Sequence, residues 1–222
     1  MGRLRIALIV ALLMAVGPFV TPGTAGGSVT WTDQPGDATG LDPLPPPAHG
    51  VITSSPRPQD DGLDLLGASA SSDGQAVVFT ARTASADMPA GASGATIRFW
   101  FSYDGVGYQF IAQRPAPDFA TVVSSGVFLR SQEPRSPELA CRECTVRYDP
   151  KTATVIVRAE VKSMATAIKQ HAPNSKKFGA GSTVTDLLVR AERNVLPLAR
   201  DVDVARTLTA DEASGEGKTL AV

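Results

Sequence analysis

An alternation of large apolar and polar residues over Ala95–Asp104 constrains the fold of this chain more than any other feature of its sequence. Its large apolar side chains fall on one face of an extended strand, because successive side chains of a strand point to opposite sides. They are Ile97, Phe99, Phe101 and Tyr103. Asp104-Gly105 is a hairpin turn signal, and Val106–Gln113 continues as a second apolar strand. These segments predict an antiparallel β-hairpin with an aromatic buried face.

Other stretches of the chain show the same period of two. Ser71–Gly74 and Asp149–Thr152 have turn composition and join two further strand pairs. We expect strands over Val29–Asp33, Leu63–Ala70, Gln75–Arg82, Cys144–Tyr148, Ala153–Glu160 and Thr183–Arg193. Phe119–Arg130 predicts either a strand pair or one bent strand, and Val202–Leu208 is a candidate for a further short strand. The apolar residues from Val161 to Ile168 have helical spacing instead, and Pro173 ends the predicted helix.

Eight or nine strands at short spacing with one brief helix predict an all-β fold, an antiparallel β-sandwich with jelly-roll-like connections. The apolar faces of the strands would fill its core. The expected core residues are Val77, Phe79, Ile97, Phe99, Phe101, Tyr108, Phe110, Val155, Val157, Leu187 and Val189. Burying such side chains contributes about 1.5–3 kcal/mol each, which is enough to stabilise one domain.

Two segments lack the composition of a sheet. Residues 34–61 contain seven of the 17 prolines and few large apolar groups, which predicts a long loop or a mobile arm. The polar, glycine-containing tail Thr209–Val222 is expected to be disordered. The predicted organisation is therefore a first strand plus arm over residues 26–62, a sandwich over residues 63–208, and the tail.

The N-terminus has the composition of a secretory signal peptide over residues 1–25. Arg3 and Arg5 precede a run of about 11 apolar residues, and small residues lead to a cleavage site after Ala25. This run is shorter than the roughly 20 residues that a helix needs to span a bilayer. We therefore expect cleavage and secretion of the mature chain.

The charge and the hydropathy of the mature chain argue against nucleic-acid binding and against a membrane span. Removing Arg3 and Arg5 from 21 basic residues leaves 19, against 22 acidic residues, a net charge near −3. No basic block is interleaved with aromatic residues, so nucleic-acid binding has no support. No second apolar stretch of spanning length occurs in the sequence, so no membrane span is expected after cleavage.

Several short motifs give the chain a family resemblance. They are Trp31-Thr-Asp33-Gln-Pro-Gly-Asp37, Leu63-Asp64-Leu65, Asp73-Gly74, the aromatic strand 97–103 and Asp201-Val-Asp203. Over about residues 29–206 the chain resembles exported actinobacterial β-sandwich proteins similar to the DOMON-like and family-nine carbohydrate-binding-module group. The resemblance implies a jelly-roll-like sandwich that often binds sugars and sometimes haem.

Both cysteines of the chain lie in Cys141-Arg-Glu-Cys144. In an oxidising compartment two cysteines at this spacing most simply form a local disulfide, which is our expectation. A redox role calls for a helix N-terminus after the pair, and β-branched Thr145-Val146 follows instead. A zinc site would need two further ligands, for which only His49 and His171 are available.

Aspartates gather near both ends of the predicted domain. The set that could supply oxygen ligands to Ca²⁺ is Asp33, Asp37, Asp60, Asp61, Asp64, Asp201 and Asp203. If the terminal segments pair, Asp33, Asp37 and Asp203 would converge, and these three are the candidate calcium ligands. The alternative is that these aspartates only cap turns, since no EF-hand spacing is present.

Trp100 falls on the opposite strand face from Phe99, beside Arg98. An exposed aromatic ring next to polar groups offers the flat apolar face and the edge hydrogen bonds that a sugar needs. Trp100, Arg98 and Trp31 are therefore the candidate ligand-binding residues. The alternative is that another sheet or the proline-rich arm covers the indoles.

Haem and catalytic chemistry have less support in the sequence. Haem ligation would need a methionine and a histidine facing one pocket, and Met164 has the spacing of a core residue instead. Neither a G-x-S-x-G nor an HExxH motif occurs. We expect no catalytic residues and no enzyme activity.

Two functional hypotheses follow from the sequence. The first is a secreted, non-catalytic binding module for carbohydrate or cell-envelope material, with structural Ca²⁺ as the one suggested cofactor. The second is a structural or protein-interaction domain that presents the proline-rich segment 34–61 to a partner.

Overall fold

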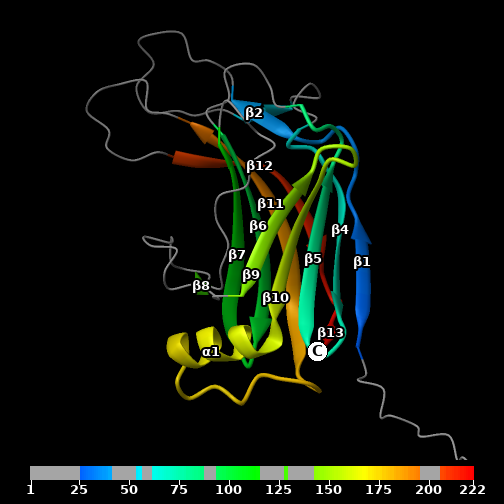
Figure 1. The fold of residues 1–222 in the computed structure, drawn as a ribbon. Coiled ribbons are helices and arrows are strands. Elements are labelled where there is room, and N and C mark those ends of the chain that lie inside the picture. The colour runs from blue at the N-terminus through cyan, green and yellow to red at the C-terminus, as the bar shows by residue number, and fades with distance from the viewer. Residues whose placement is uncertain are drawn as a thin grey trace, which may run out of the picture.

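The computed structural model describes residues 26–41, 54–56, 62–87, 94–115, 128–129, 143–195 and 206–222. Within these residues the chain forms thirteen β-strands and one α-helix (Figure 1). The strands form two large antiparallel sheets and a two-stranded one. The predicted all-β antiparallel fold with one short helix is confirmed, with more strands than the eight or nine expected.

The first sheet has the strand order β1-β4-β5-β10-β9. Its strands are β1 (Ser28–Thr32), β4 (Leu65–Ser72), β5 (Ala76–Thr83), β9 (Cys144–Asp149) and β10 (Thr154–Glu160). Both hairpins predicted in this part of the chain form. At the β4–β5 turn, Asp73 Oδ1 accepts hydrogen bonds from the backbone N–H groups of Gln75 and Ala76 at 2.8 and 2.7 Å. The Asp side chain therefore fixes the turn that its sequence predicts.

The second sheet has the order β12-β11-β6-β7-β8, and β13 pairs with β11. Its strands are β6 (Gly94–Tyr103), β7 (Val106–Pro115), β8 (Phe128–Leu129), β11 (Thr183–Val195), β12 (Arg206–Gly215) and β13 (Leu220–Ala221). The aromatic hairpin β6–β7 forms as predicted. Asp104 and Gly105 at its turn have φ values of 50° and 77°, as a type I′ turn requires.

The helix α1 (Val161–His171) continues directly from β10, which confirms the predicted helix. Its buried residues are Val161, Met164, Ala167 and Ile168, so one side of the helix packs on the core. The helix ends two residues before Pro173. It lies at the end of the molecule opposite β2 (Figure 1).

Aromatic rings join the two large sheets. Phe79 on β5 lies 6.1, 5.7 and 5.5 Å, between ring centroids, from three rings of the second sheet. These are Phe99, Phe101 and Phe110. All the core residues expected from the sequence are buried. The arrangement is sandwich-like, and the jelly-roll-like order of connections stays a prediction.

The expectation of a disordered tail over Thr209–Val222 is wrong. β12 extends to Gly215, and the side chains of Leu220 and Val222 are buried in the core. The Val222 N–H donates to the Ser182 carbonyl oxygen at 2.8 Å. This segment is poor in large apolar residues, and its order comes from the pairing of β12 and β13 with β11, which its own composition does not reveal. Of the short strand predicted over Val202–Leu208, β12 contains the part from Arg206 onward.

The composition of the proline-rich segment 34–61 led us to expect a loop or arm without sheet, but two short strands form within it. Its strands β2 (Thr39–Leu41) and β3 (Ser54–Pro56) pair antiparallel. Pro56 stands at the end of a strand, where a missing N–H disturbs pairing least. The segment between β2 and β3, and residues 57–61, lie outside the described residues. So do the predicted signal peptide and all of the predicted strand Phe119–Arg130 except β8.

Candidate functional site

Three aspartates converge where an edge of the first sheet meets an edge of the second. Asp33 follows β1, Asp37 follows four residues later, and Asp211 lies on β12. One carboxylate oxygen from each lies within 4.8 Å of the others. We call these three residues the acidic cluster.

A β-bulge in β4 shapes the part of the cluster around Asp33. The β4–β5 register shifts between Leu65 and Gly67, and the Leu66 carbonyl oxygen accepts a hydrogen bond from the Asp33 N–H at 3.3 Å. Gly67 has φ 144°, and a Cβ there would lie 2.6 Å from the Trp31 carbonyl oxygen. Glycine therefore permits the close approach of β1 to β4 that sets the position of Asp33.

A second bulge, in β12, lies beside Asp211. Asp211 is opposite Ala191 and Thr209 is opposite Glu192, so Ala210 is the additional residue of the bulge. Bulges commonly change the direction of a side chain at the edge of a sheet. Here Asp211 is 8% exposed, and its Oδ2 accepts a hydrogen bond from the Leu65 N–H at 2.6 Å. Its Oδ1 accepts one from the Glu212 N–H at 2.7 Å.

The side chain of Asp64 holds the loop that carries Asp37. Both carboxylate oxygens of the buried Asp64 accept a hydrogen bond from the Gly36 N–H, at 3.0 and 2.9 Å. Gly36 has φ 82°, in the left-handed region where glycine is unstrained. Asp64 therefore positions the loop beside the cluster, and both of its carboxylate oxygens are engaged in that hydrogen bonding.

The electrostatics of the acidic cluster favour a bound cation. Burial raises the pKa of Asp211 to about 7, and the nearby carboxylates of Asp33 and Asp37 add to this rise against the opposing Leu65 hydrogen bond. Burial also raises the pKa of Asp33, with Asp37 and Asp64 contributing through like charge. Within the described part of the chain, no lysine or arginine forms an ion pair with these three aspartates. The buried Oδ2 of Asp33 has no hydrogen-bond partner among the residues that the structure describes.

The geometry of the cluster suits Ca²⁺. Oxygens bound to one Ca²⁺ at 2.3–2.6 Å lie at most about 5 Å apart, and the three aspartate oxygens meet that limit. Three carboxylates supply three to six ligand atoms, and water or backbone carbonyl groups commonly complete the six to eight that Ca²⁺ takes.

The predicted ligand set was Asp33, Asp37 and Asp203, and the structure brings the first two together. Asp203 lies outside the described residues, as do Asp60, Asp61 and Asp201. Asp211 was missed because the tail had been assigned to disorder. The small and polar residues of this segment give no period-two strand signal that could have placed Asp211 on a strand.

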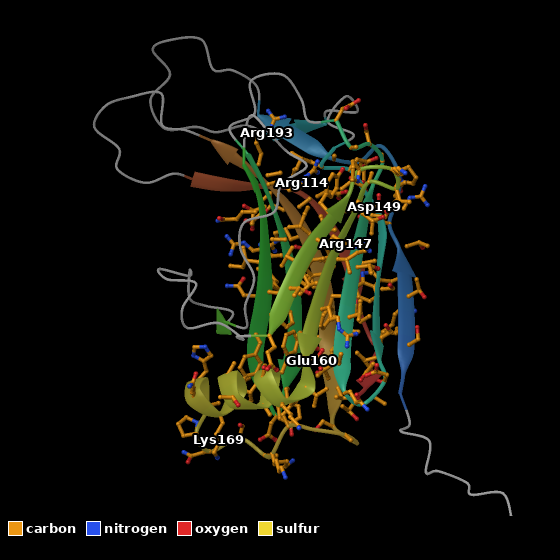
Figure 2. The ribbon with its side chains drawn as sticks, in the orientation of Figure 1. Arg114, Arg147, Asp149, Glu160, Lys169 and Arg193 are labelled. Carbon is orange, nitrogen blue, oxygen red and sulfur yellow. The ribbon has the colours of Figure 1, made fainter. Side chains whose placement is uncertain are left out.

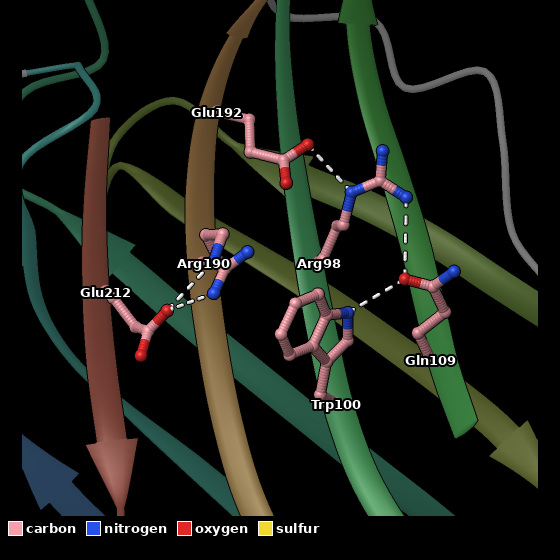
Figure 3. A network of polar contacts seen from close by, with 6 residues as sticks. All are labelled: Arg98, Trp100, Gln109, Arg190, Glu192 and Glu212. Atoms are coloured by element: carbon pink, nitrogen blue, oxygen red, sulfur yellow. Dashed lines mark hydrogen bonds and ion pairs between the residues drawn. The ribbon is translucent and has the colours of Figure 1, made fainter. Parts of the chain in front are cut away.

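A second set of polar side chains lies on the face of the second sheet that points away from the core (Figure 3). Trp100 is half-buried there, and its Nε1–H donates to Gln109 Oε1 at 2.8 Å. The Arg190 guanidinium lies 4.2 Å from the centroid of the indole ring. Arg190 in turn donates to Glu212 Oε2 from its Nε at 2.8 Å. One face of the indole is therefore covered by a cation that is itself held in place.

Arg98, the polar neighbour predicted to assist Trp100, is buried. Its Nε donates to Glu192 Oε2 at 2.7 Å, and the two side chains are only 5% and 7% exposed. Its Nη1 lies 3.4 Å from Gln109 Oε1 (Figure 3). The Arg98 guanidinium is therefore covered, and it reaches Trp100 only through Gln109 Oε1, which also accepts the indole hydrogen bond.

The other described candidates, Trp31, Met164 and Cys144, are all at least partly buried. Trp31 is 5% exposed, and its Nε1–H donates to the Ala213 carbonyl oxygen at 3.1 Å, so it joins β1 to β12 and offers no exposed face. Met164 is buried in the core, as its spacing predicted. Cys144 is half-buried at the start of β9, and its predicted partner Cys141 lies outside the described residues, as does His49.

Comparison with protein-family models, with curated proteins and with solved structures gave no match. The resemblance to the DOMON-like and family-nine carbohydrate-binding-module group therefore stays a prediction from short motifs. Among the described residues, no helix has both the length and the apolar character needed to cross a membrane.

Proposed function

We propose that this chain is a non-catalytic binding module that acts outside the cytoplasm and holds a structural Ca²⁺ ion at Asp33, Asp37 and Asp211. The convergence of three carboxylates at a seam between the two sheets carries the proposal. Two predictions from the sequence support a location outside the cytoplasm. The predicted signal peptide over residues 1–25 would direct export, and the predicted Cys141–Cys144 disulfide would persist in the oxidising environment outside.

The ion would join segments that are far apart in the chain. Asp33 and Asp37 come from the N-terminal part and Asp211 from β12. Neutralising three carboxylates at one seam would hold the edge strand β1 against the second sheet. Extracellular calcium modules commonly bind with Kd values of about 10⁻⁴ to 10⁻³ M, and three carboxylates in a partly open site fit that range.

Calorimetric titration with CaCl₂ and thermal unfolding in CaCl₂ or EDTA test the calcium site. We expect a Kd in that range and, at ten times the Kd, a stabilisation of about 1.4 kcal/mol. Asp211→Asn should lose both effects. Asp87→Asn, an exposed aspartate outside the acidic cluster, is the matched control and should keep both. Wild-type protein that shows no heat of binding and no shift in Tm would contradict the calcium assignment.

Carbohydrate is the ligand class that the outer face of the second sheet favours. Trp100 is half-buried, and Arg190 and Glu212 beside it have side-chain exposures of 27% and 40%. An aromatic ring with partly exposed charged hydrogen-bonding groups at its edge is the composition of a sugar subsite. Glu212 directly follows Asp211 on β12, so the sugar surface and the calcium site share one strand.

A glycan array and pull-down on insoluble polysaccharide test this surface. Wild-type protein should be retained and Trp100→Ala should lose retention by about tenfold or more, which corresponds to loss of a stacking contact of at least 1.4 kcal/mol. Lys151→Ala, an exposed change in the β9–β10 turn, is the control that should be retained like the wild type. Equal retention of Trp100→Ala, or no retention of the wild type on any glycan, would point to the alternative of a protein-interaction domain.

A further inference from the structure

A groove beside α1 contains basic residues that neither the acidic cluster nor the outer face of the second sheet uses. It has a volume of about 610 Å³, within the range of small-molecule sites. Its walls are the exposed side of α1 and the loop that follows it. The lining residues are Ala165, Thr166, Ile168, Lys169, Gln170 and Ser175 to Phe178.

The loop wall of this groove is fixed to the β6–β7 hairpin. The Tyr103 hydroxyl donates to the Lys177 carbonyl oxygen at 3.0 Å, and the rings of Tyr103 and Phe178 pack edge to face with centroids 5.0 Å apart. Asp104 Oδ2 accepts a hydrogen bond from the Lys176 N–H at 2.8 Å. The groove is therefore held open by tertiary contacts and is present without a ligand.

The charge of the groove is positive and its base is apolar. Lys169, Lys176 and Lys177 stand around it, and no carboxylate is among the lining residues in the described part of the chain. Asp104, outside the lining, offsets part of the charge of Lys176 at 3.3 Å, and the Lys169 ammonium donates to the Pro173 carbonyl oxygen. The exposed Lys177 ammonium has no hydrogen bond or ion pair in the described part of the chain. Figure 2 shows Lys169 on α1, at the end of the molecule opposite Arg193.

We propose that this groove binds a monomeric amphiphilic anion, a single alkyl chain with a carboxylate or phosphate head. The lysines would pair with the head, and Ala165, the edges of Ile168 and Phe178, and the aliphatic stems of the lysines would contact the chain. Charge complementarity selects an anion, and the apolar base selects one with an alkyl chain over a simple ion.

The test is calorimetric titration of the full mature chain with sodium dodecanoate and with dodecyl phosphate, below their critical micelle concentrations. We expect saturable binding of both. Lys169→Gln combined with Lys177→Gln should weaken it about tenfold, because two cations are lost from the rim. Thr166→Trp, which fills the groove from an exposed helix position, should abolish it. Lys162→Gln, on the same helix outside the groove lining, is the matched control.

Three further titrations can overturn the proposal. Equal affinity for uncharged dodecyl maltoside would show that the lysines select nothing. Binding of inorganic phosphate with the same affinity would show that the apolar base contributes nothing. Binding to vesicles of anionic phospholipid without binding of monomeric dodecanoate would assign the lysines to a membrane surface instead. Circular dichroism of each variant must match the wild type, so that loss of folding is not mistaken for loss of binding.

Discussion

The backbone N–H of Leu65 donates a 2.6 Å hydrogen bond to the carboxylate of Asp211, a residue 146 positions further along the chain. Leu65 begins β4 of the first sheet and Asp211 lies on β12 of the second. This bond joins the two sheets at the seam where Asp33 and Asp37 also lie. The Asp211 carboxylate therefore links the two sheets and also forms part of the candidate metal site.

Stability of the calcium-free protein should fall as pH rises from about 4 to about 7. Burial raises the pKa of Asp211 from 3.8 to about 7, so the folded state holds a proton over this window that the unfolded state has released. The stability given by that proton is complete below the unfolded pKa and is lost as pH passes the folded pKa. Urea unfolding in EDTA across this pH range measures the effect.

Asp211→Asn is the control for this pH dependence. The amide does not titrate, so the variant should lose the part of the decline that Asp211 causes. Calcium should remove the same decline in the wild type, because it binds the ionised carboxylate. Identical pH profiles for the wild type and Asp211→Asn would mean that Asp211 is not the titrating group.

Leu220→Ala should destabilise the protein by about 2–5 kcal/mol, the usual cost of emptying a core site. Leu220 is 1% exposed although only two residues follow it in the sequence. Lys218→Ala changes a neighbouring exposed side chain and should stay within about 0.5 kcal/mol of the wild type. The free energy of unfolding in urea separates the two. Equal stability of both variants would restore the view that the tail is disordered.

Gly67→Ala should cost about 1–3 kcal/mol because the residue has φ 144° and a Cβ would meet the Trp31 carbonyl oxygen at 2.6 Å. Gly179→Ala is the comparison, since a Cβ there meets nothing within 4 Å. Gly67→Ala should also weaken Ca²⁺ binding, because it moves β1 and with it Asp33. Unchanged stability and unchanged calcium affinity would show that β1 adapts without moving the cluster.

Arg98→Met should cost about 3–5 kcal/mol, because it leaves the buried carboxylate of Glu192 without its cation. The double variant Arg98→Met with Glu192→Met should recover part of that loss. Arg158 and Glu160 form an exposed pair, with side chains 48% and 34% exposed, and Arg158→Met should cost less than about 1 kcal/mol. Denaturant unfolding of the four proteins gives the comparison. If Arg98→Met and Arg158→Met lowered the free energy of unfolding by the same amount, burial of the Arg98–Glu192 pair would not be the cause of the loss.

Local patterns predicted most of the fold. The β6–β7 hairpin combines alternating aromatic residues with Asp104-Gly105, and both signals act between neighbours in sequence. The helix at Val161 and the core position of Met164 follow from a spacing that is equally local. The candidate ligands Asp33 and Asp37 could be named for the same reason, since they stand in one short turn-rich segment.

The sequence by itself therefore determined the strands and turns of the hairpins β4–β5, β6–β7 and β9–β10, and which face of each of these strands is apolar. Only the tertiary structure decided that Thr209–Val222 is ordered, that Trp31 is buried against Ala213, and that Asp211 completes the acidic cluster. The physical reason is that these features depend on contacts between segments that are not neighbours in sequence, from β11 with the tail to the Leu65–Asp211 bond across 146 positions. A strand of small residues such as β12 gains its stability from partners that no local pattern identifies.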